Sequence, residues 1–413
     1  MSHLSSIPGS RSGAGGGALC VWLLAVSAFV IVTTEFLIVG LLPALARDLE
    51  VSVAAAGGLV TLFAFTVMLA GPILTSLVSH LDRKKLFVVL LLVFAGSNAL
   101  AALSQNIWVL AVARFIPAIA LPVFWGTASE TAAEIAGPTR AAKAVANVYM
   151  GIAAAMVLGV PLGTLAGAAV GWRGAFMGLA ILSLAMAALL HWVMPTLARP
   201  QKLKIGRQIR ILKDPALLAQ LGLSVLVFTA MFTAYTYLAD LLEQAAGVPA
   251  NEVGWWLMCF GVVGLAGNWL GGLFGGSDPL RATAIGVAVL AVGMSLSSVL
   301  VLNHAWLMAA LALWGLANTA LYPICQIRVM RAAAHTQALA GTLNVSMANA
   351  GIGLGAIIGG AATQAFGVQS TGHVAAVIAV LALAYIPVAA TLVRRISGLS
   401  LIHISEPTRP LYI

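Results

Sequence analysis

Charged residues are scarce in this sequence: they make up 8% of its 413 residues, whereas 61% are hydrophobic. Soluble domains carry about 25% charged residues, so the composition excludes an ordinary soluble protein. The apolar stretches between the charges are long enough to cross a bilayer. We predict an all-α integral membrane protein with twelve transmembrane spans, at residues 18–45, 53–77, 86–104, 107–129, 144–170, 174–194, 216–241, 253–275, 282–302, 306–327, 337–366 and 372–393.

Residues that build metal sites or enzyme active sites are also few. The three cysteines, Cys20, Cys259 and Cys325, lie within predicted spans and have no paired spacing, which argues against a disulfide framework. The histidines are scattered without a His-x-x-x-His pair, and no phosphate-binding loop with its lysine is present. We therefore expect no metal, no cofactor and no ATP hydrolysis, and we do not expect an enzyme.

The net charge of +9 is sorted by loop. Basic residues fall in alternate loops, at Arg83 to Lys85, Arg140, Lys143, Arg199 to Lys213, Arg281, Arg328, Arg331, Arg394 and Arg395. The positive-inside rule places these loops and both termini in the cytoplasm. The opposite loops hold only Arg47 and Arg173 among bases. Charge sorted in this way indicates membrane topology and no nucleic-acid partner.

The sequence indicates an internal duplication. Residues separated by 196 positions repeat, as in Gly71 and Gly267, Gly58 and Gly254, Asp82 and Asp278, Gly159 and Gly355, Gly163 and Gly359, and Gly171 and Gly367. The longest polar connection, residues 195–215, is basic and separates the two halves. We predict two parallel six-helix bundles, at 18–194 and 216–395, with the connection as a cytoplasmic linker.

Both ends of the chain differ from the rest. Residues 1–17 are rich in serine and glycine, and we expect a disordered cytoplasmic start. The apolar run from Ala18 exceeds a signal-peptide core, so we predict that it is the first span. Residues 399–413 break every trend, and LSLIHISEPTR within them resembles a translated sequencing-library adapter. We expect this tail to be an artefact, a natural short tail being the alternative.

Small residues form a stripe in the fifth span. Gly151, Gly159, Gly163 and Gly167 stand near every fourth position, Pro161 interrupts the run, and Gly171-Trp172-Arg173 closes it. Such a stripe lets two membrane helices approach closely, and packed neighbours tolerate the proline. The pattern resembles motif C of major facilitator antiporters. The GVPLGT run and the following Gly-Trp-Arg are similar to the drug:H+ antiporter group that includes arabinose-type and ribonucleoside efflux permeases. The resemblance implies the major facilitator fold, with two pseudo-symmetric six-helix bundles.

Glu35 is the one acid deep inside a span of the first half. A carboxyl group in apolar surroundings is costly to keep and marks a functional position, because it can take up and release a proton. Arg114 occupies the place of the arginine in the family's motif B, and we predict that it is the only base inside a span. Estimated helix depths of the two residues are compatible, so we predict that Arg114 and Glu35 couple to protons; the alternative is that Arg114 only binds backbone carbonyls.

The duplication offset places Met231 opposite Glu35 and Ala310 opposite Arg114. The first half is therefore expected to handle protons and the second to contribute more to substrate selection. Asp82 and Arg83 lie where the family's gating motif A belongs, between the second and third spans. The positive-inside rule alone also explains the basic residues there.

Aromatic and amide side chains supply the substrate-binding candidates. Trp314, Asn318 and Tyr322 recur every four residues on one helix face. The further candidates are Trp125, Tyr149, Tyr235, Asn344 and Asn349. This set suits an uncharged polar solute such as a sugar or nucleoside, and it suits many drugs.

The resemblance implies a proton-coupled exporter that works by alternating access. Its expected partners are a small-molecule substrate, protons and the lipid bilayer, and its expected location is the bacterial inner membrane, as a monomer. Multidrug efflux is the alternative, and a receptor that binds a solute without moving it stays open.

Overall fold

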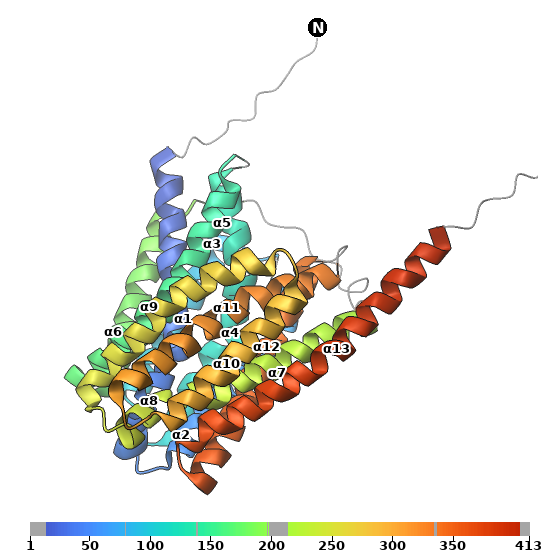
Figure 1. Cartoon of the computed structure of the whole chain (residues 1–413). Helices are drawn as coiled ribbons and strands as arrows, with labels where there is room; N and C mark the ends of the chain where they lie inside the picture. The colour runs from blue at the N-terminus through green and yellow to red at the C-terminus, as the bar shows by residue number, and fades with distance from the viewer. Residues whose placement is uncertain are drawn as a thin grey trace, which may run out of the picture.

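The computed structural model describes residues 14–78, 80–137, 139–195, 197, 214–333 and 337–404. Of the predicted disordered start, linker and tail, residues 1–13, 196, 198–213 and 405–413 lie outside this part, whereas residues 14–17 of the start already belong to a helix. The described part is almost wholly helical (Figure 1). Its helices are α1 (Ala14–Asp48), α2 (Val53–Val78), α3 (Arg83–Ala102), α4 (Ile107–Ala136), α5 (Ala141–Ala154), η1 (Ala155–Gly159), α6 (Val160–Val193), α7 (Pro215–Tyr235), α8 (Leu238–Asp240), η4 (Leu241–Ala245), α9 (Ala250–Gly275), α10 (Pro279–Val299), α11 (His304–Ala332), α12 (Gln337–Phe366) and α13 (Ser370–Ile404).

Eleven stretches of the described residues are long and apolar enough to cross a membrane. One of them, Lys143–Val193, has 51 residues, about twice the length that a single crossing needs. Gly171 breaks it with φ 77° and ψ 157°, a backbone conformation that favours glycine. The stretch therefore makes two crossings, and the predicted total of twelve is confirmed.

The helices form two bundles. In the first, α1 packs against α5 and α6, and α3 packs against α4 and α6. In the second, α7 packs against α12 and α13, and α11 packs against α9 and α10. The bundles meet where α2 lies along α12, where η1 and α6 lie on α9, and where α1 reaches α8.

The duplication offset of 196 recurs in local geometry. Asp82 caps α3 by accepting a hydrogen bond from the backbone N–H of Lys85, and Asp278 caps α10 in the same way from Arg281. Gly171 and Gly367 both have a left-handed φ, of 77° and 81°. The two halves thus share their helix starts and corners as well as their hydropathy.

The glycine stripe packs against α1. A side chain at Gly159 would meet Thr33, one at Gly163 would meet Leu37, and one at Gly167 would meet Leu41. The π-helical segment η1 comes directly before Pro161, which stands at the start of α6. A local π turn is one way in which a helix accommodates a proline. In the second half Gly355 approaches Thr229 of α7, the pair that corresponds to Gly159 and Thr33.

Replacing Gly151 by alanine tests this packing. A Cβ atom there would lie 2.0 Å from the backbone oxygen of Ala25, so α1 and α5 would have to separate. We expect Gly151→Ala to cost about 2–3 kcal/mol, in the range of overpacked cores. Thermal unfolding in detergent measures it. Gly178→Ala in α6 is the matched control, because nothing lies within 4 Å of its Cβ position; equal melting temperatures would contradict the close approach.

The Gly-Trp-Arg corner ties α6 to two other helices. Trp172 Nε1 donates to Asp48 Oδ2 at 3.0 Å, and Arg173 forms an ion pair with the same carboxylate at the end of α1. Arg173 also donates from Nε and Nη2 to the backbone oxygen of Ser104, after α3. Its guanidinium lies 4.2 Å from the Trp172 ring centroid. The corner therefore fixes the ends of α1 and α3 to the Gly171 break within α6.

Candidate functional site

Arg114 joins α4 to α1 in the interior of the first bundle. Its side chain is 1% exposed. Nη1 donates to the backbone oxygen of Thr34 at 2.5 Å, and Nη2 donates to that of Glu35 at 2.7 Å. The guanidinium also lies 4.4 Å from the ring centroid of Phe63 in α2, within the range of a cation–π contact. One side chain thus binds α1 at the position of its buried acid.

These hydrogen bonds answer part of the sequence-based hypothesis. Arg114 does meet Glu35, through the backbone oxygen; both the coupling hypothesis and its alternative allow this contact, and coupling stays a prediction. None of the three ion pairs in the described part of the chain includes either residue. The carboxyl and the guanidinium are nevertheless electrostatic neighbours. Asn98 of α3 donates to the Thr34 hydroxyl at 3.1 Å, so this segment of α1 is held from two helices.

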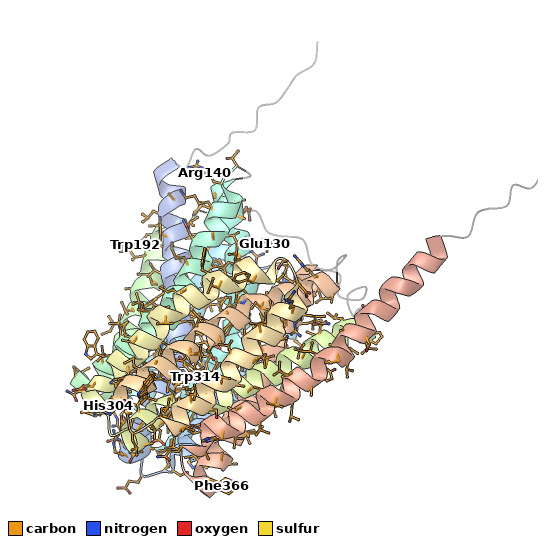
Figure 2. All side chains as sticks on the ribbon, viewed as in Figure 1. Glu130, Arg140, Trp192, His304, Trp314 and Phe366 are labelled. Carbon is orange, nitrogen blue, oxygen red and sulfur yellow. The ribbon has the colours of Figure 1, made fainter. Side chains whose placement is uncertain are left out.

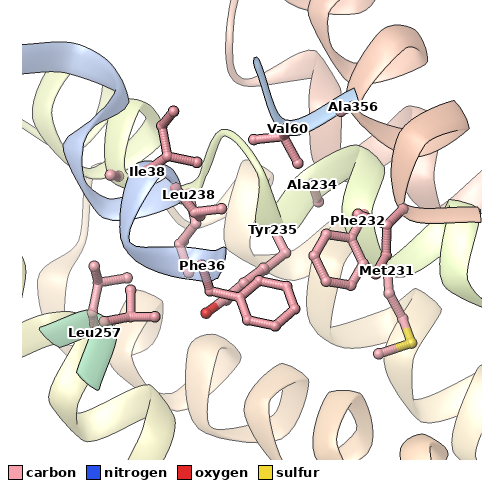
Figure 3. Close-up of a cluster of buried hydrophobic side chains, with 14 of the residues drawn as sticks. Phe36, Ile38, Val60, Met231, Phe232, Ala234, Tyr235, Leu238, Leu257 and Ala356 are labelled. Atoms are coloured by element: carbon pink, nitrogen blue, oxygen red, sulfur yellow. The ribbon is translucent and has the colours of Figure 1, made fainter. Parts of the chain in front are cut away.

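An aromatic cluster faces this segment from the second bundle. Phe260 of α9 lies between Tyr235, at a ring-centroid distance of 5.6 Å, and Trp314, at 5.4 Å. Phe232 of α7 contacts Tyr235 and, across the bundle interface, Phe36 of α1. Figure 3 shows Phe36, Phe232 and Tyr235 side by side, and Figure 2 places Trp314 in the middle of the molecule.

A small cavity opens beside the cluster, between the two bundles. Val157 and Pro161 line it from the first bundle, and Tyr235, Phe260 and Asn318 line it from the second. The side-chain oxygen of Asn318, 3% exposed, has no hydrogen-bond partner within the described residues. A buried amide without a partner is costly. The cavity measures about 20 Å³, room for one water molecule, so a solute could bind this amide only after the bundles move apart.

Two further polar groups of the same α11 face are unpaired within the resolved helices. They are Tyr322 Oη, one turn beyond Asn318, and Trp314 Nε1, one turn before it. Tyr322 packs edge-on against Phe228 of α7, with 5.0 Å between ring centroids. Phe228 stands one turn before Phe232 on α7, and the Phe232 ring contacts Phe36, the residue that follows Glu35. The predicted α11 face and the Glu35 segment of α1 are therefore linked through two phenylalanines of α7.

The remaining sequence-based candidates make no ring contact or side-chain hydrogen bond to this region among the described residues. Tyr149 of α5 is 54% exposed. Trp125 of α4 is half-buried against the apolar core. Asn349 of α12 donates to the backbone oxygen of Val345 at 3.1 Å, and its own Oδ1 is unpaired. Asn344 belongs to a separate polar cluster.

That cluster corrects the sequence analysis. Arg328 was predicted to lie in a loop, but α11 continues to Ala332 and buries its side chain to 3% exposure. Arg114 is therefore not the only base inside a span. Arg328 Nη2 donates to Ser224 Oγ at 2.8 Å, and Ser224 donates to Asn344 Oδ1 at 2.7 Å. Asn344 Nδ2 donates in turn to Gln326 Oε1 at 2.7 Å.

The predicted gating residues lie at the end of the molecule that carries the basic loops, which we call the basic end. Asp82 caps α3, as described, and Arg83 is 2% exposed. Arg83 Nη2 forms an ion pair with Glu130 Oε2 of α4 at 2.7 Å. Figure 2 shows Glu130 and Arg140 toward this end. Within the first bundle, the pair fastens α3 to α4.

The opposite end is closed by contacts between the bundles. Arg47 of α1 forms an ion pair with Glu243 of η4 at 2.5 Å. Tyr237 is fully buried and is held within the second bundle, where it donates to the backbone oxygen of Ala356 in α12 at 2.8 Å. A side chain at Gly57 of α2 would collide with its hydroxyl. The structure is thus a state in which this end is shut.

Two other observations complete the survey. A larger cavity lies at the basic end, between α1, α4 and α5, away from the α11 face. The part of the chain that is described contains no group of three histidine, cysteine, aspartate or glutamate residues that could hold a metal ion.

Comparison with known proteins agrees with this architecture. The sequence profile of the Major Facilitator Superfamily matches residues 24–275. The inner membrane transport protein YdhP of Escherichia coli (strain K12) is 33% identical over 343 residues, which are 83% of this chain and 88% of that protein. The uncharacterized MFS-type transporter YtbD of Bacillus subtilis is 33% identical over 358 residues, 84% and 89% of the two chains.

A solved structure shares the fold. The crystal structure of a bacterial homolog of the human lysosomal transporter Spinster, inward-facing and unoccupied, superposes with a TM-score of 0.79 at 16% identity, covering 94% of this chain and 99% of that one. With twelve crossings in two related bundles, and relatives and a profile that each match more than half of its length, this chain belongs to the major facilitator superfamily, as a secondary transporter.

Proposed function

We propose that this protein is a proton-coupled antiporter that exports a small polar or amphipathic solute across the inner membrane by alternating access, in the manner of sugar or nucleoside efflux. The observation that carries the proposal is the proximity of Glu35 to the α11 face. The Glu35 segment is connected to the unpaired Tyr322 hydroxyl and Asn318 amide through Phe36, Phe232 and Phe228, so a carboxyl that exchanges a proton there allows the proton and the solute to compete for one region.

The surroundings of this region favour transport. The opposite end is shut by contacts that join the two bundles, the Arg47–Glu243 ion pair and the close approach of Gly57 to Tyr237, and such contacts must break for alternating access. The basic loops support a cytoplasmic basic end, with both termini inside. The relatives named as inner membrane and MFS-type transporters support the same location and activity.

The test uses everted membrane vesicles that hold a proton gradient. We expect one class of added solute, among sugars, nucleosides and drugs, to dissipate the gradient with the native chain and not with Glu35→Gln. Glu134→Gln is the control, because Glu134 is exposed on α4 and its loss should change nothing. Proton release that survives in Glu35→Gln would contradict the assigned proton site.

Multidrug efflux is the second candidate, because the Tyr235, Phe260 and Trp314 rings offer apolar surface to many solutes. The same panel separates the two: a drug response without a sugar or nucleoside response favours this candidate. Solute binding without flux would instead identify a receptor.

A further inference from the structure

Three arginine side chains are buried among the described residues, and two of them have an acid beside them. Arg83 forms an ion pair with Glu130, and Arg114 has Glu35 as an electrostatic neighbour. Arg328 is 3% exposed and takes part in no ion pair of the described chain. A buried guanidinium without a counter-charge is strongly unfavourable.

The hydrogen bonds of Arg328 are incomplete as well. Nη2 reaches Ser224, but Nε and Nη1 have no partner within the resolved helices. Gln220, one turn from Ser224 on the same face of α7, is 1% exposed and has an unpaired Oε1. The other groups here are the neutral amides of Asn344 and Gln326 and the buried thiol of Cys325, which neighbours both Arg328 and Ser224. The cluster supplies donors and a positive charge, and no acid.

The cluster continues the substrate face of α11. Trp314, Asn318 and Tyr322 recur every four residues, and the next position in that series is Gln326. Gln326 is half-buried and leads through Asn344 and Ser224 to Arg328. Along the helix axis, Tyr322 and Arg328 are separated by about 9 Å, at about 1.5 Å per residue, and Arg328 stands about 120° round the helix from Tyr322, on the side that meets Ser224 of α7. A solute of sugar or nucleoside size can span this distance.

We propose that the exported solute carries an anionic group, a carboxylate or a phosphate, that Arg328 binds while the polar body of the solute occupies the α11 face. This inference rests on the proposed transport function and names its substrate class. A carboxylate or phosphate matches the planar fork of a guanidinium through two parallel hydrogen bonds. Export of an anion against an entering proton moves positive charge inward, so an inside-negative membrane potential also drives the exchange.

Matched pairs of solutes test the charge requirement. The purified full-length protein is titrated with gluconate and glucose, and with uridine monophosphate and uridine, and ligand binding is followed as a rise in melting temperature. We expect the anionic member of one pair to raise the melting temperature at concentrations at which its neutral partner does not. The gluconate pair reports on a carboxylate, and the uridine pair reports on a phosphate.

Variants locate the charge. In Arg328→Gln, the anion concentration for half of the shift should rise at least tenfold, and Arg328→Lys should keep part of the affinity. Without ligand, Arg328→Gln should melt at or above the native temperature, because it removes an unpaired buried charge. That result also shows that the variant is folded.

Several results would overturn the proposal. They are a native protein that responds to neither anion, an equal response to the neutral members, an unchanged anion response in Arg328→Gln, or a loss of stability in unliganded Arg328→Gln. If a neutral sugar drives proton release that depends on Glu35, the antiport proposal stands and the proposal of an anionic substrate at Arg328 is wrong.

Discussion

Transport should fall at least 100-fold when Arg114 is replaced by glutamine. The guanidinium holds the backbone oxygens of Thr34 and Glu35 at once and contacts the Phe63 ring. Glutamine has neither the reach nor the charge, so the Glu35 segment of α1 loses its anchor and its neighbouring positive charge together. Loss of geometry at a reacting group commonly costs about 100-fold. The effect is measured as uptake, into everted vesicles, of the solute class that dissipates the proton gradient with the native chain.

The lysine variant separates charge from geometry. Lysine keeps the charge but offers one compact ammonium where the guanidinium offers a planar fork. We expect Arg114→Lys to transport slowly and to keep the native pH dependence, whereas the residual transport of Arg114→Gln should show an altered one. An unchanged pH dependence in Arg114→Gln would mean that Arg114 has a structural role alone. Arg281→Gln, on the exposed start of α10, is the control for loss of a positive charge.

The end opposite the basic loops should open when Arg47 is replaced by glutamine. Glu243 is 12% exposed, and Asp240, whose Oδ1 is unpaired among the described residues, is its electrostatic neighbour. Arg47 is the positive charge that both acids face. Two unit charges a few ångströms apart interact by about 1 kcal/mol in water and about 4 kcal/mol near a protein surface. Removal of Arg47 should thus shift the equilibrium between the shut and the open state of this end by about 1–2 kcal/mol toward the open state, which raises the ratio of open to shut molecules five- to thirtyfold.

The two partners of this ion pair should not be equivalent. Glu243→Gln leaves Arg47, with 52% of its side chain exposed, beside Asp240, so we expect less than a threefold change. The readout is the rate at which a membrane-impermeant maleimide labels Ala239→Cys, a buried position of α8, after the native cysteines are replaced by alanine. Equal rates in native and Arg47→Gln protein would show that the ion pair does not hold this end shut.

The sequence predicted the spans and the duplication because both depend on patterns that one chain carries alone. Long apolar runs define crossings whatever surrounds them. Asp82 and Asp278 were paired by spacing, and each caps a helix. The glycine stripe was predicted to bring two helices together, and it lies against α1.

The predictions that failed depend on which helix faces which. Arg328 was placed in a loop because a charge ends an apolar run, but Ser224 and Asn344, from α7 and α12, give it a buried setting that sequence spacing does not reveal. Tyr149, exposed on α5, stays a prediction. Gln326 was missed although it continues the four-residue series of Trp314, Asn318 and Tyr322, which was the available signal.

Two contacts between α1 and the second bundle join residues that correspond to each other in the duplication, and they bear on how the protein evolved. Phe36 and Phe232 differ by 196 positions, and so do Arg47 and Glu243. In a dimer of two identical halves, a residue on the two-fold axis meets its own copy. Phenylalanine tolerates that meeting, and arginine does not, because two like charges repel. The aromatic contact is therefore compatible with a symmetric ancestor made of two identical subunits. The ion pair is not, because it needs opposite charges at the same position of the two halves. It can have arisen only after the halves were encoded separately, as two genes or as two parts of one fused gene.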